Sequence, residues 1–190
     1  MNRLICFGCS ITSGYALLDK NTSWPSRLSK ILNKNLIRIA DPGASNLEIL
    51  YNVLKFDFEP TDLVVILWTY PDRDIIFQEN FNCIRLPWAG SIEQEGWMLA
   101  HNSFDLAVRS WICFNHAASY LDCKDIDYYF FSANLLVTTT YKPSFIKNVI
   151  NDLDIRKISK IDFALDKKHP GPKSHNVIAN RIAGVINGSQ

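Results

Sequence analysis

Short apolar runs alternate with segments of helical periodicity along this chain, and the alternation predicts an α/β domain with a mostly parallel sheet. The run at 63–68 is apolar on both faces, which is typical of a central parallel strand. Shorter or less uniform runs predict three further strands, at 4–7, 36–40 and 128–132.

Apolar residues at helical spacing predict four helices, which begin near Pro25, at Ser45, at Ser103 and at Gly171-Pro172. In the second helix, Ser45 is expected to cap the first turn while Glu48 reaches back to it, as in a capping box. The residues expected to face the core are, in chain order, Leu28, Ile31, Leu32, Leu47, Leu50, Val53, Leu54, Phe104, Ala107, Val108, Trp111, Phe114, Val177, Ile178, Ile182 and Val185.

Two stretches, 75–100 and 138–165, fit neither pattern. The first places large aromatic residues among polar ones, and the second mixes Thr, Lys and Asp with scattered aliphatic residues. Both are expected to be loop or lid insertions in a single domain of residues 1–190, and long loops of this kind often carry function.

The composition agrees with one globular domain, since the chain has 190 residues, of which 47% are hydrophobic and 21% charged. Its formal net charge of +1 gives no electrostatic reason to expect binding to nucleic acid or to an anionic membrane. The longest clean apolar run, 63–68, is far shorter than the roughly 20 residues that span a bilayer.

The five cysteines are an odd number, and free buried thiols are expected rather than a disulfide framework. Cys6 and Cys9 form a Cys-x-x-Cys pair, but no second pair with zinc spacing follows, and Cys6 stands in an apolar run. We therefore expect no metal site.

Three separated segments carry candidate chemistry, and each lies just after a predicted strand or just before a predicted helix. Ligand sites of open α/β sheets gather at that edge. In the first segment, Ser10 follows Gly8 on a tight turn, which can expose a nucleophile beside backbone N–H groups. Cys9 is a rival nucleophile, and an ordinary Ser/Gly turn is the structural alternative.

The second segment, 41–46, holds Gly43, which allows a close approach of the backbone just before a helix. The third holds Asp166 and His169 on a loop punctuated by proline and glycine. A carboxylate three residues before a histidine can orient the imidazole as a general base for a serine. An ordinary turn and an ordinary surface loop are the alternatives for these two segments.

Together, the three segments resemble the sequence blocks of the SGNH (GDSL-type) hydrolase family, in order and over nearly the whole chain. This resemblance implies a three-layer α/β/α flavodoxin-like fold with a mostly parallel sheet of about five strands. The matching residues are Gly8, Ser10, Thr12 and Gly14 in the first block, Gly43 in the second, and Asp166, His169 and Pro170 in the last.

The resemblance also implies roles for these residues. Ser10 would be the nucleophile, His169 the base and Asp166 the acid that orients it. The backbone N–H groups of Ser10 and Gly43 would form part of the oxyanion hole. Typical members remove acyl or acetyl groups from lipids, thioesters or glycans, and the resemblance implies neither a metal nor another cofactor.

Two departures from the family pattern stand out. Cys9 replaces the usual aspartate before the serine. The family's Gly-x-Asn-Asp block, expected after the central strand, is missing. In the family the Asn of this block donates a hydrogen bond to the oxyanion. Loss of one such donor lowers the rate by about 10²–10³-fold. Tyr70, Arg73 or Asn46 would have to replace that donor, and a competing interpretation pairs Arg73 with a neighbouring aspartate. The segment that stands there is Trp68-Thr69-Tyr70-Pro71-Asp72-Arg73.

The favoured function is a serine esterase or deacetylase that acts on an acyl ester of a sugar. Trp68, Tyr70, Trp88 and Trp97 could offer stacking faces to a small-molecule or glycan ester, with core packing as the alternative for each. The rival hypothesis is a catalytically lapsed binding or structural domain, since the altered block resembles SGNH-like proteins of bacteriophages. Without a signal peptide in the sequence, a cytoplasmic or virion-associated protein is expected.

Overall fold

The computed structural model describes residues 2–77, 83–85, 102–134, 149–150 and 153–188. Much of both expected insertions lies outside the described residues, and so do Trp88 and Trp97. The described part of the first insertion is an antiparallel pair, β4 (Ile75–Phe77) and β5 (Cys83–Arg85).

The centre of the molecule is a four-stranded parallel sheet in the order β2-β1-β3-β6. Every residue of the central strand β3 is buried, as its continuous apolar sequence predicts. An isolated parallel bridge between Phe130 and Val149 extends the sheet beyond β6 by one residue pair. The α/β prediction is therefore confirmed, with four strands described rather than about five. The strands are β1 (Arg3–Gly8), β2 (Asn35–Ala40), β3 (Leu63–Trp68) and β6 (Asp127–Ser132).

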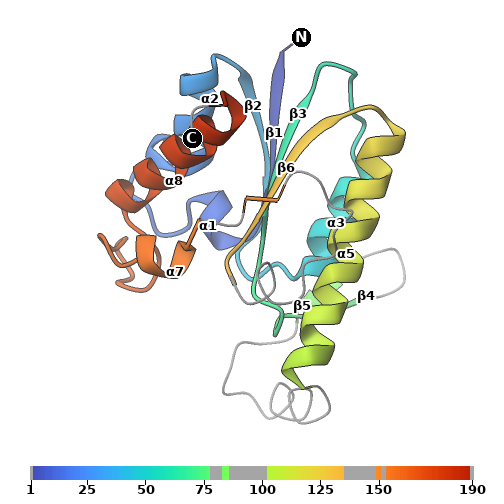
Figure 1. The fold of residues 1–190 in the computed structure, drawn as a ribbon. Coiled ribbons are helices and arrows are strands. Elements are labelled where there is room, and N and C mark those ends of the chain that lie inside the picture. The colour runs from blue at the N-terminus through green and yellow to red at the C-terminus, as the bar shows by residue number, and fades with distance from the viewer. Residues whose placement is uncertain (1, 78–82, 86–101, 135–148, 151–152, 189–190) are drawn as a thin grey trace.

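Helices cover both faces of this sheet and complete the three layers (Figure 1). The helices α2 (Trp24–Leu32) and α8 (Pro172–Ile186) pack against one face, and α3 (Asn46–Lys55) and α5 (Ser103–Cys123) pack against the other. Shorter helical segments are α1 (Ser10–Ser13), η1 (Lys20–Thr22) and α7 (Ile155–Ile158).

On each helix fewer apolar residues are buried than the periodicity of the sequence predicts. In α3 the fully packed residues are Ile49, Leu50 and Val53. A helix that lies on a sheet buries only the arc that faces it, so apolar residues at the margins of that arc stay in contact with water. The expected core residues that are instead 37–56% exposed are Ile31, Leu47, Leu54, Phe104 and Val108.

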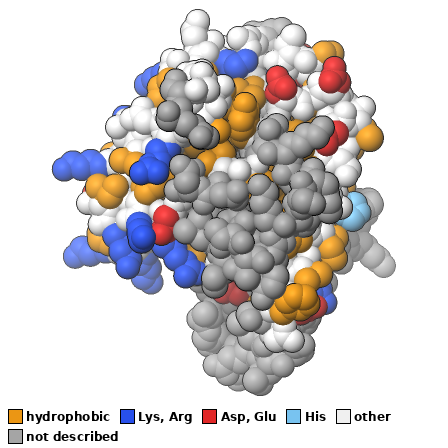
Figure 2. All heavy atoms as spheres, in the orientation of Figure 1, with side chains coloured by type: hydrophobic (Ala, Val, Ile, Leu, Met, Phe, Trp, Pro, Cys, Tyr) orange, Lys and Arg blue, Asp and Glu red, His pale blue; other side chains and the backbone are white. Residues whose placement is uncertain are grey.

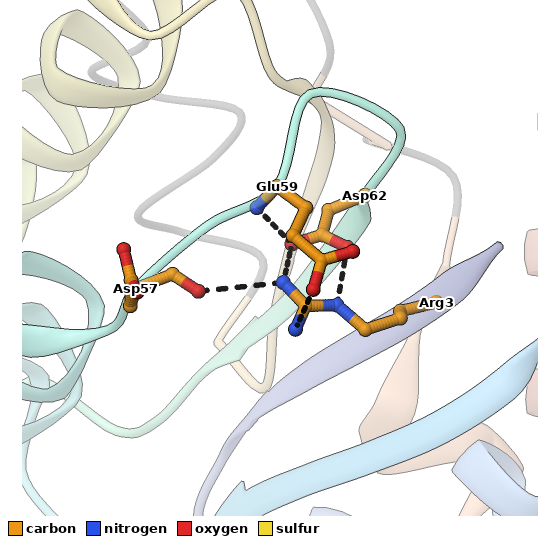
Figure 3. Close-up of polar contacts among 4 residues, drawn as sticks. All are labelled: Arg3, Asp57, Glu59 and Asp62. Atoms are coloured by element: carbon orange, nitrogen blue, oxygen red, sulfur yellow. Dashed lines mark hydrogen bonds and ion pairs between the residues drawn. The ribbon is translucent and has the colours of Figure 1, made fainter. Parts of the chain in front are cut away.

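A cluster of charged residues ties the sheet together at the edge where the parallel strands begin (Figure 3). Arg3 at the start of β1 donates two hydrogen bonds, of 2.7 and 2.6 Å, to the carboxylate of Asp62, and it also pairs with Glu59 at 2.8 Å. Burial of Asp62 opposes its ionisation, but the hydrogen bonds from Arg3 and from the Glu59 N–H outweigh it and lower the pKa of Asp62. The site described below lies at the opposite edge of the sheet.

Cys6, Cys9 and Cys113 are free and buried thiols, as predicted, whereas the free thiol of Cys123 is exposed. Burial raises the pKa of the Cys6 thiol, and it raises that of Cys113 to about 12. Among the helices of the described ranges, none combines the length and the apolar character that crossing a membrane requires.

A buried histidine joins α8 to α2. The Nδ1 atom of His175 accepts a hydrogen bond of 3.1 Å from the backbone N–H of Trp24, so this nitrogen carries no proton in the bonded form. Burial disfavours the imidazolium and lowers the pKa of His175 from 6.5 to about 4. The folded protein therefore keeps His175 neutral at a pH where the unfolded chain binds a proton there.

We expect stability to fall as the pH drops from about 6.5 to 4, by about 3 kcal/mol from this residue alone. Urea unfolding of wild type and His175→Asn at pH 7, 5.5 and 4 measures the effect, since Asn retains an acceptor for the Trp24 N–H. The variant should show a flatter dependence on pH, whereas the exposed His116→Asn control should keep the wild-type slope. If stability depends on pH equally in wild type and His175→Asn, His175 is not the cause of the pH dependence.

Candidate active site

Ser10 stands at the carboxyl end of β1, where strand and helix meet without a loop. Gly8 ends the strand, Cys9 has extended backbone, and Ser10 is the first residue of α1. A Cβ atom on Gly8 would lie 2.1 Å from the Thr12 hydroxyl oxygen, so only glycine permits α1 to fold this closely over the strand. The sequence predicted a polar turn here, and the structure instead forms one turn of helix.

The side chain of Ser10 is nearly buried, with 3% of the residue exposed, although its turn predicted an exposed hydroxyl. Its Oγ lies 4.0 Å from the Cys9 sulfur. The carbonyl of Ser10 accepts from the Tyr15 N–H and the Ser13 hydroxyl, both at 3.0 Å. Among the described residues, no acceptor bonds the backbone N–H of Ser10 or of Gly43.

Gly43 has a left-handed backbone, with φ of 82°, in the loop between β2 and α3. Ser45 caps α3 by accepting the Glu48 N–H at 3.1 Å, as predicted. The Glu48 carboxylate does not complete the capping box; it instead binds the Arg85 guanidinium, which also reaches Asp41 at 3.3 Å. A Cβ atom placed on Gly43 would lie 3.6 Å from the Cδ atom of Arg85. The ion pair between Arg85 and Glu48 therefore packs against the Gly43 loop.

Asp166 and His169 face one another on a tightly closed loop before α8. The Nδ1 atom of His169 lies 2.5 Å from one carboxylate oxygen of Asp166. The other oxygen accepts the backbone N–H groups of Lys168 and His169, both at 3.0 Å. A bond of 2.9 Å from the Ala164 N–H to the His169 carbonyl closes the loop. The imidazole is thereby fixed with Nε2 as its remaining functional nitrogen.

The charge of Asp166 is set by these bonds. Partial burial opposes its ionisation, but the backbone N–H groups of His169 and Lys168 and the His169 ring outweigh it and lower the pKa of Asp166 to about 2. Asp166 is therefore a carboxylate throughout the neutral range. A fixed negative charge behind Nδ1 stabilises an imidazolium that forms when the ring takes up a proton.

Tyr15 joins the serine segment to the histidine loop. Its ring lies 5.2 Å from the His169 ring, and the neighbouring Ala16 carbonyl accepts the Leu165 N–H at 3.2 Å. Ser10 and His169 themselves are not hydrogen-bonded to each other, although both side chains belong to the described residues. Catalytic hydrogen bonds are often long without substrate. Nothing in the local sequence pattern around Tyr15 indicates its contact with His169.

The segment after β3 places Tyr70 between two guanidinium groups, with Arg73 at 5.4 Å and Arg156 of α7 at 5.8 Å from its ring. Burial, together with the Cys9 thiol and Asp72, raises the pKa of Tyr70 against the opposing effect of the two arginines. Tyr70 packs against the hydrophobic cluster that includes Ile11 of α1, the helix that Ser10 begins. Arg156 is far away in the sequence and was not anticipated.

Arg73 and Asn46 are both hydrogen-bonded to Thr69. Arg73 donates to the Thr69 hydroxyl at 2.7 Å. The Asn46 side-chain oxygen accepts the Thr69 N–H at 2.8 Å, and its amide nitrogen donates to Ser110 at 3.0 Å. The Asn46 amide therefore anchors the segment after β3 to α3 and α5, and its hydrogen-bonding groups are already engaged.

Trp68 does not offer a stacking face to a substrate, contrary to expectation. It is fully buried, and its ring stacks on Phe114 of α5 at a centroid distance of 4.4 Å. The alternation of side chains along β3 turns this residue into the layer of α3 and α5 rather than toward the end of the strand. Trp88 and Trp97 lie outside the described residues.

The sequence matches no protein-family model and none of the curated proteins compared with it. Its structure is similar to solved structures over almost its whole length. TesA aligns with a TM-score of 0.69 at 12% identity, over 99% of both chains. A lipolytic protein of the G-D-S-L family from Veillonella parvula aligns with a TM-score of 0.59 at 16% identity, over 97% of this chain and 98% of that one.

The acetyl xylan esterase Est2A from Butyrivibrio proteoclasticus aligns with a TM-score of 0.62 at 12% identity, over 98% of this chain and 64% of that one. At these identities the likeness is one of fold. The chain has the fold of the SGNH (GDSL-type) hydrolases, as the order of its sequence blocks predicted, in a strongly divergent sequence.

Proposed function

We propose that this protein is a serine esterase or deacetylase that hydrolyses a small acyl ester through Ser10, His169 and Asp166. The observation that carries the proposal is the 2.5 Å contact between the Asp166 carboxylate and His169 Nδ1, on a loop that closes beside the serine segment. A loop with only a structural role has no evident need for an imidazole that is oriented by a carboxylate. The esterase fold of the similar structures supports the same chemistry.

In this mechanism Ser10 Oγ attacks the ester carbonyl carbon while His169 Nε2 takes the hydroxyl proton. The backbone N–H groups of Ser10 and Gly43 donate to the oxyanion that forms. The tetrahedral intermediate expels the alcohol, which receives the proton from His169. Water, deprotonated by His169, then attacks the acyl-Ser10 ester and releases a carboxylic acid and free Ser10.

A small acyl group on a sugar is the substrate class we favour. A cavity of about 200 Å³ lies beside the altered third block, between the start of α3 and α5, and Asn46, Pro71, Arg73 and Cys113 are among its lining residues. Ser10 and His169 are not among its described lining residues, so its volume does not define the acyl chain. The acetyl xylan esterase among the similar structures gives a precedent for such an ester on this fold.

Tyr70 or Arg73 is proposed to supply the oxyanion donor that the third block lacks. Tyr70→Phe and Arg73→Ala should each be tested on p-nitrophenyl acetate, and the variant that removes the donor should lower kcat by about 10²-fold or more, with a smaller change in KM. Arg109, an arginine of the same cavity that is paired with Asp105, provides the matched Arg109→Ala control and should keep its kcat. Wild-type turnover in both test variants would refute this role.

The second candidate is a catalytically lapsed SGNH-like binding domain, for example a phage virion component. Two observations favour it: Ser10 is nearly buried, and it makes no hydrogen bond to His169 among the described residues. Binding of acetylated and deacetylated xylan-type oligosaccharides by isothermal titration, alongside turnover of p-nitrophenyl acetate, separates the two functions. Glycan binding with no turnover on any ester would favour the lapsed domain.

A further inference from the structure

The segment before the Asp166–His169 loop turns its apolar side chains outward. Ile161, Phe163 and Leu165 are 52%, 53% and 65% exposed, while the intervening Ala164 is buried. The other intervening residue, Asp162, directs its carboxylate to the backbone at the start of α8. An extended segment normally buries its apolar row and exposes its polar row, so this pattern is inverted.

A second exposed apolar stretch lies beside this one. Leu165 is hydrogen-bonded through its backbone to Ala16, and the two residues that flank Ala16–Leu17 are Tyr15, 49% exposed, and Leu18, 87% exposed. Contiguous exposed apolar side chains of this size mark interaction sites more often than chance. We call the five side chains of Tyr15, Leu18, Ile161, Phe163 and Leu165 the apolar rim.

Basic side chains surround the apolar rim. Figure 2 shows Lys and Arg side chains gathered over the region of α7 and α8, with hydrophobic side chains between them. The acidic residues of this region keep their charge but are outnumbered by the basic ones: Asp154, Asp162 and Asp166 accept backbone N–H groups, and Asp19 is exposed beside Leu18. The exposed basic residues between 153 and 173 are Arg156, Lys157, Lys160, Lys167, Lys168 and Lys173.

The formal net charge of +1 does not show that basic and acidic residues are separated on the surface. Many acidic residues lie elsewhere, as in the cluster around Arg3 (Figure 3). The net charge by itself gave no electrostatic reason to expect binding to an anionic membrane. Local charge, rather than net charge, determines attraction within a Debye length of about 8–10 Å. The basic surface around the apolar rim can therefore attract an anionic membrane despite the small net charge.

We propose that the apolar rim and its lysines dock onto an anionic lipid bilayer, with the apolar side chains in the headgroup region and the lysines on lipid phosphates. Lysine attracts the protein to anionic headgroups, whereas protein–protein interfaces are depleted in lysine. The apolar side chains also project from two neighbouring loops, which suits insertion into a fluid interface. If the proposed esterase function is correct, docking brings the His169 loop to the membrane surface.

Vesicle sedimentation with the Ser10→Ala protein tests docking independently of catalysis. The probes are phosphatidylcholine vesicles with and without 30 mol% phosphatidylglycerol, at low and at physiological salt. We expect binding to the anionic vesicles only, weakened by salt. Lys160→Gln/Lys167→Gln should bind about thirtyfold more weakly, and Phe163→Ser/Leu165→Ser at least about tenfold more weakly.

The matched control is Lys55→Gln/Lys124→Gln, two exposed lysines on the side of the sheet covered by α3 and α5, and it should bind as the parent does. Thermal melting followed by circular dichroism verifies that each variant is folded. Absence of binding to both vesicles, or undiminished binding by the Lys160/Lys167 pair, overturns the proposal. Lysine-dependent binding of poly-glutamate without vesicle binding would overturn it in favour of an acidic protein partner.

Discussion

Replacing Ser10 with alanine is expected to lower kcat for ester hydrolysis by about 10⁴-fold or more while leaving the fold intact. In the proposed mechanism the Ser10 Oγ atom forms the bond to the acyl group, and the remaining groups can only bind and polarise the ester. Among the described residues its polar contact is the 4.0 Å approach to the Cys9 sulfur, so we expect little stability to depend on the hydroxyl itself. The measurement is turnover of p-nitrophenyl acetate, with thermal melting of both proteins.

Labelling with a fluorophosphonate probe identifies which of the two adjacent nucleophiles reacts. Ser10→Ala should lose the label, whereas Cys9→Ala should retain it. The structural reason is that Cys9 packs in the hydrophobic cluster with Phe7 and Trp68, while Ser10 begins α1 at the carboxyl end of β1. Labelling that persists in Ser10→Ala and disappears in Cys9→Ala would make Cys9 the nucleophile.

The fold could be predicted from the sequence because its signals are local. Each strand of the sheet is a short apolar run bounded by Gly, Pro or polar residues, and β3 is recognisable by being apolar on both faces. Parallel strands then place their carboxyl ends at one edge, which brings Ser10 and Tyr70 to neighbouring strand ends. Asp166 and His169 could be paired in advance because only two residues separate them.

Contacts that join distant segments could not be predicted in this way. Arg85 on the Gly43 loop, Arg156 on Tyr70 and Tyr15 on His169 each bring together residues from different parts of the chain. Trp68 shows the limit at a single position, because an aromatic residue at a strand end can face either the core or a ligand, and only the packing of α5 decides. The buried hydroxyl of Ser10 likewise depends on tertiary packing around a turn that looks open in sequence.

Replacing Asp166 with asparagine is expected to lower kcat by about 10³–10⁴-fold. Asp166 accepts three hydrogen bonds: two backbone N–H groups bind one carboxylate oxygen, and His169 Nδ1 approaches the other. Asparagine keeps one oxygen for the backbone N–H groups, but its amide nitrogen cannot accept the bond from His169 Nδ1. The imidazole would then lose the tautomer and the negative charge that its role as a base requires. His169→Ala should lose at least as much activity, because it removes the base itself.

The decisive control is Asp162→Asn, on the same segment. Asp162 also accepts backbone N–H groups, from Lys173 and Ser174, and its pKa is likewise lowered against the effect of burial, but it does not touch His169. Both folded-state pKa values lie below those of the unfolded chain, so each carboxylate stabilises the fold above about pH 4 and loses that effect as the pH falls further. Both variants should therefore melt earlier at pH 7, with only Asp166→Asn losing turnover. If Asp162→Asn loses as much kcat as Asp166→Asn, the loop is merely structural and the proposed triad is wrong.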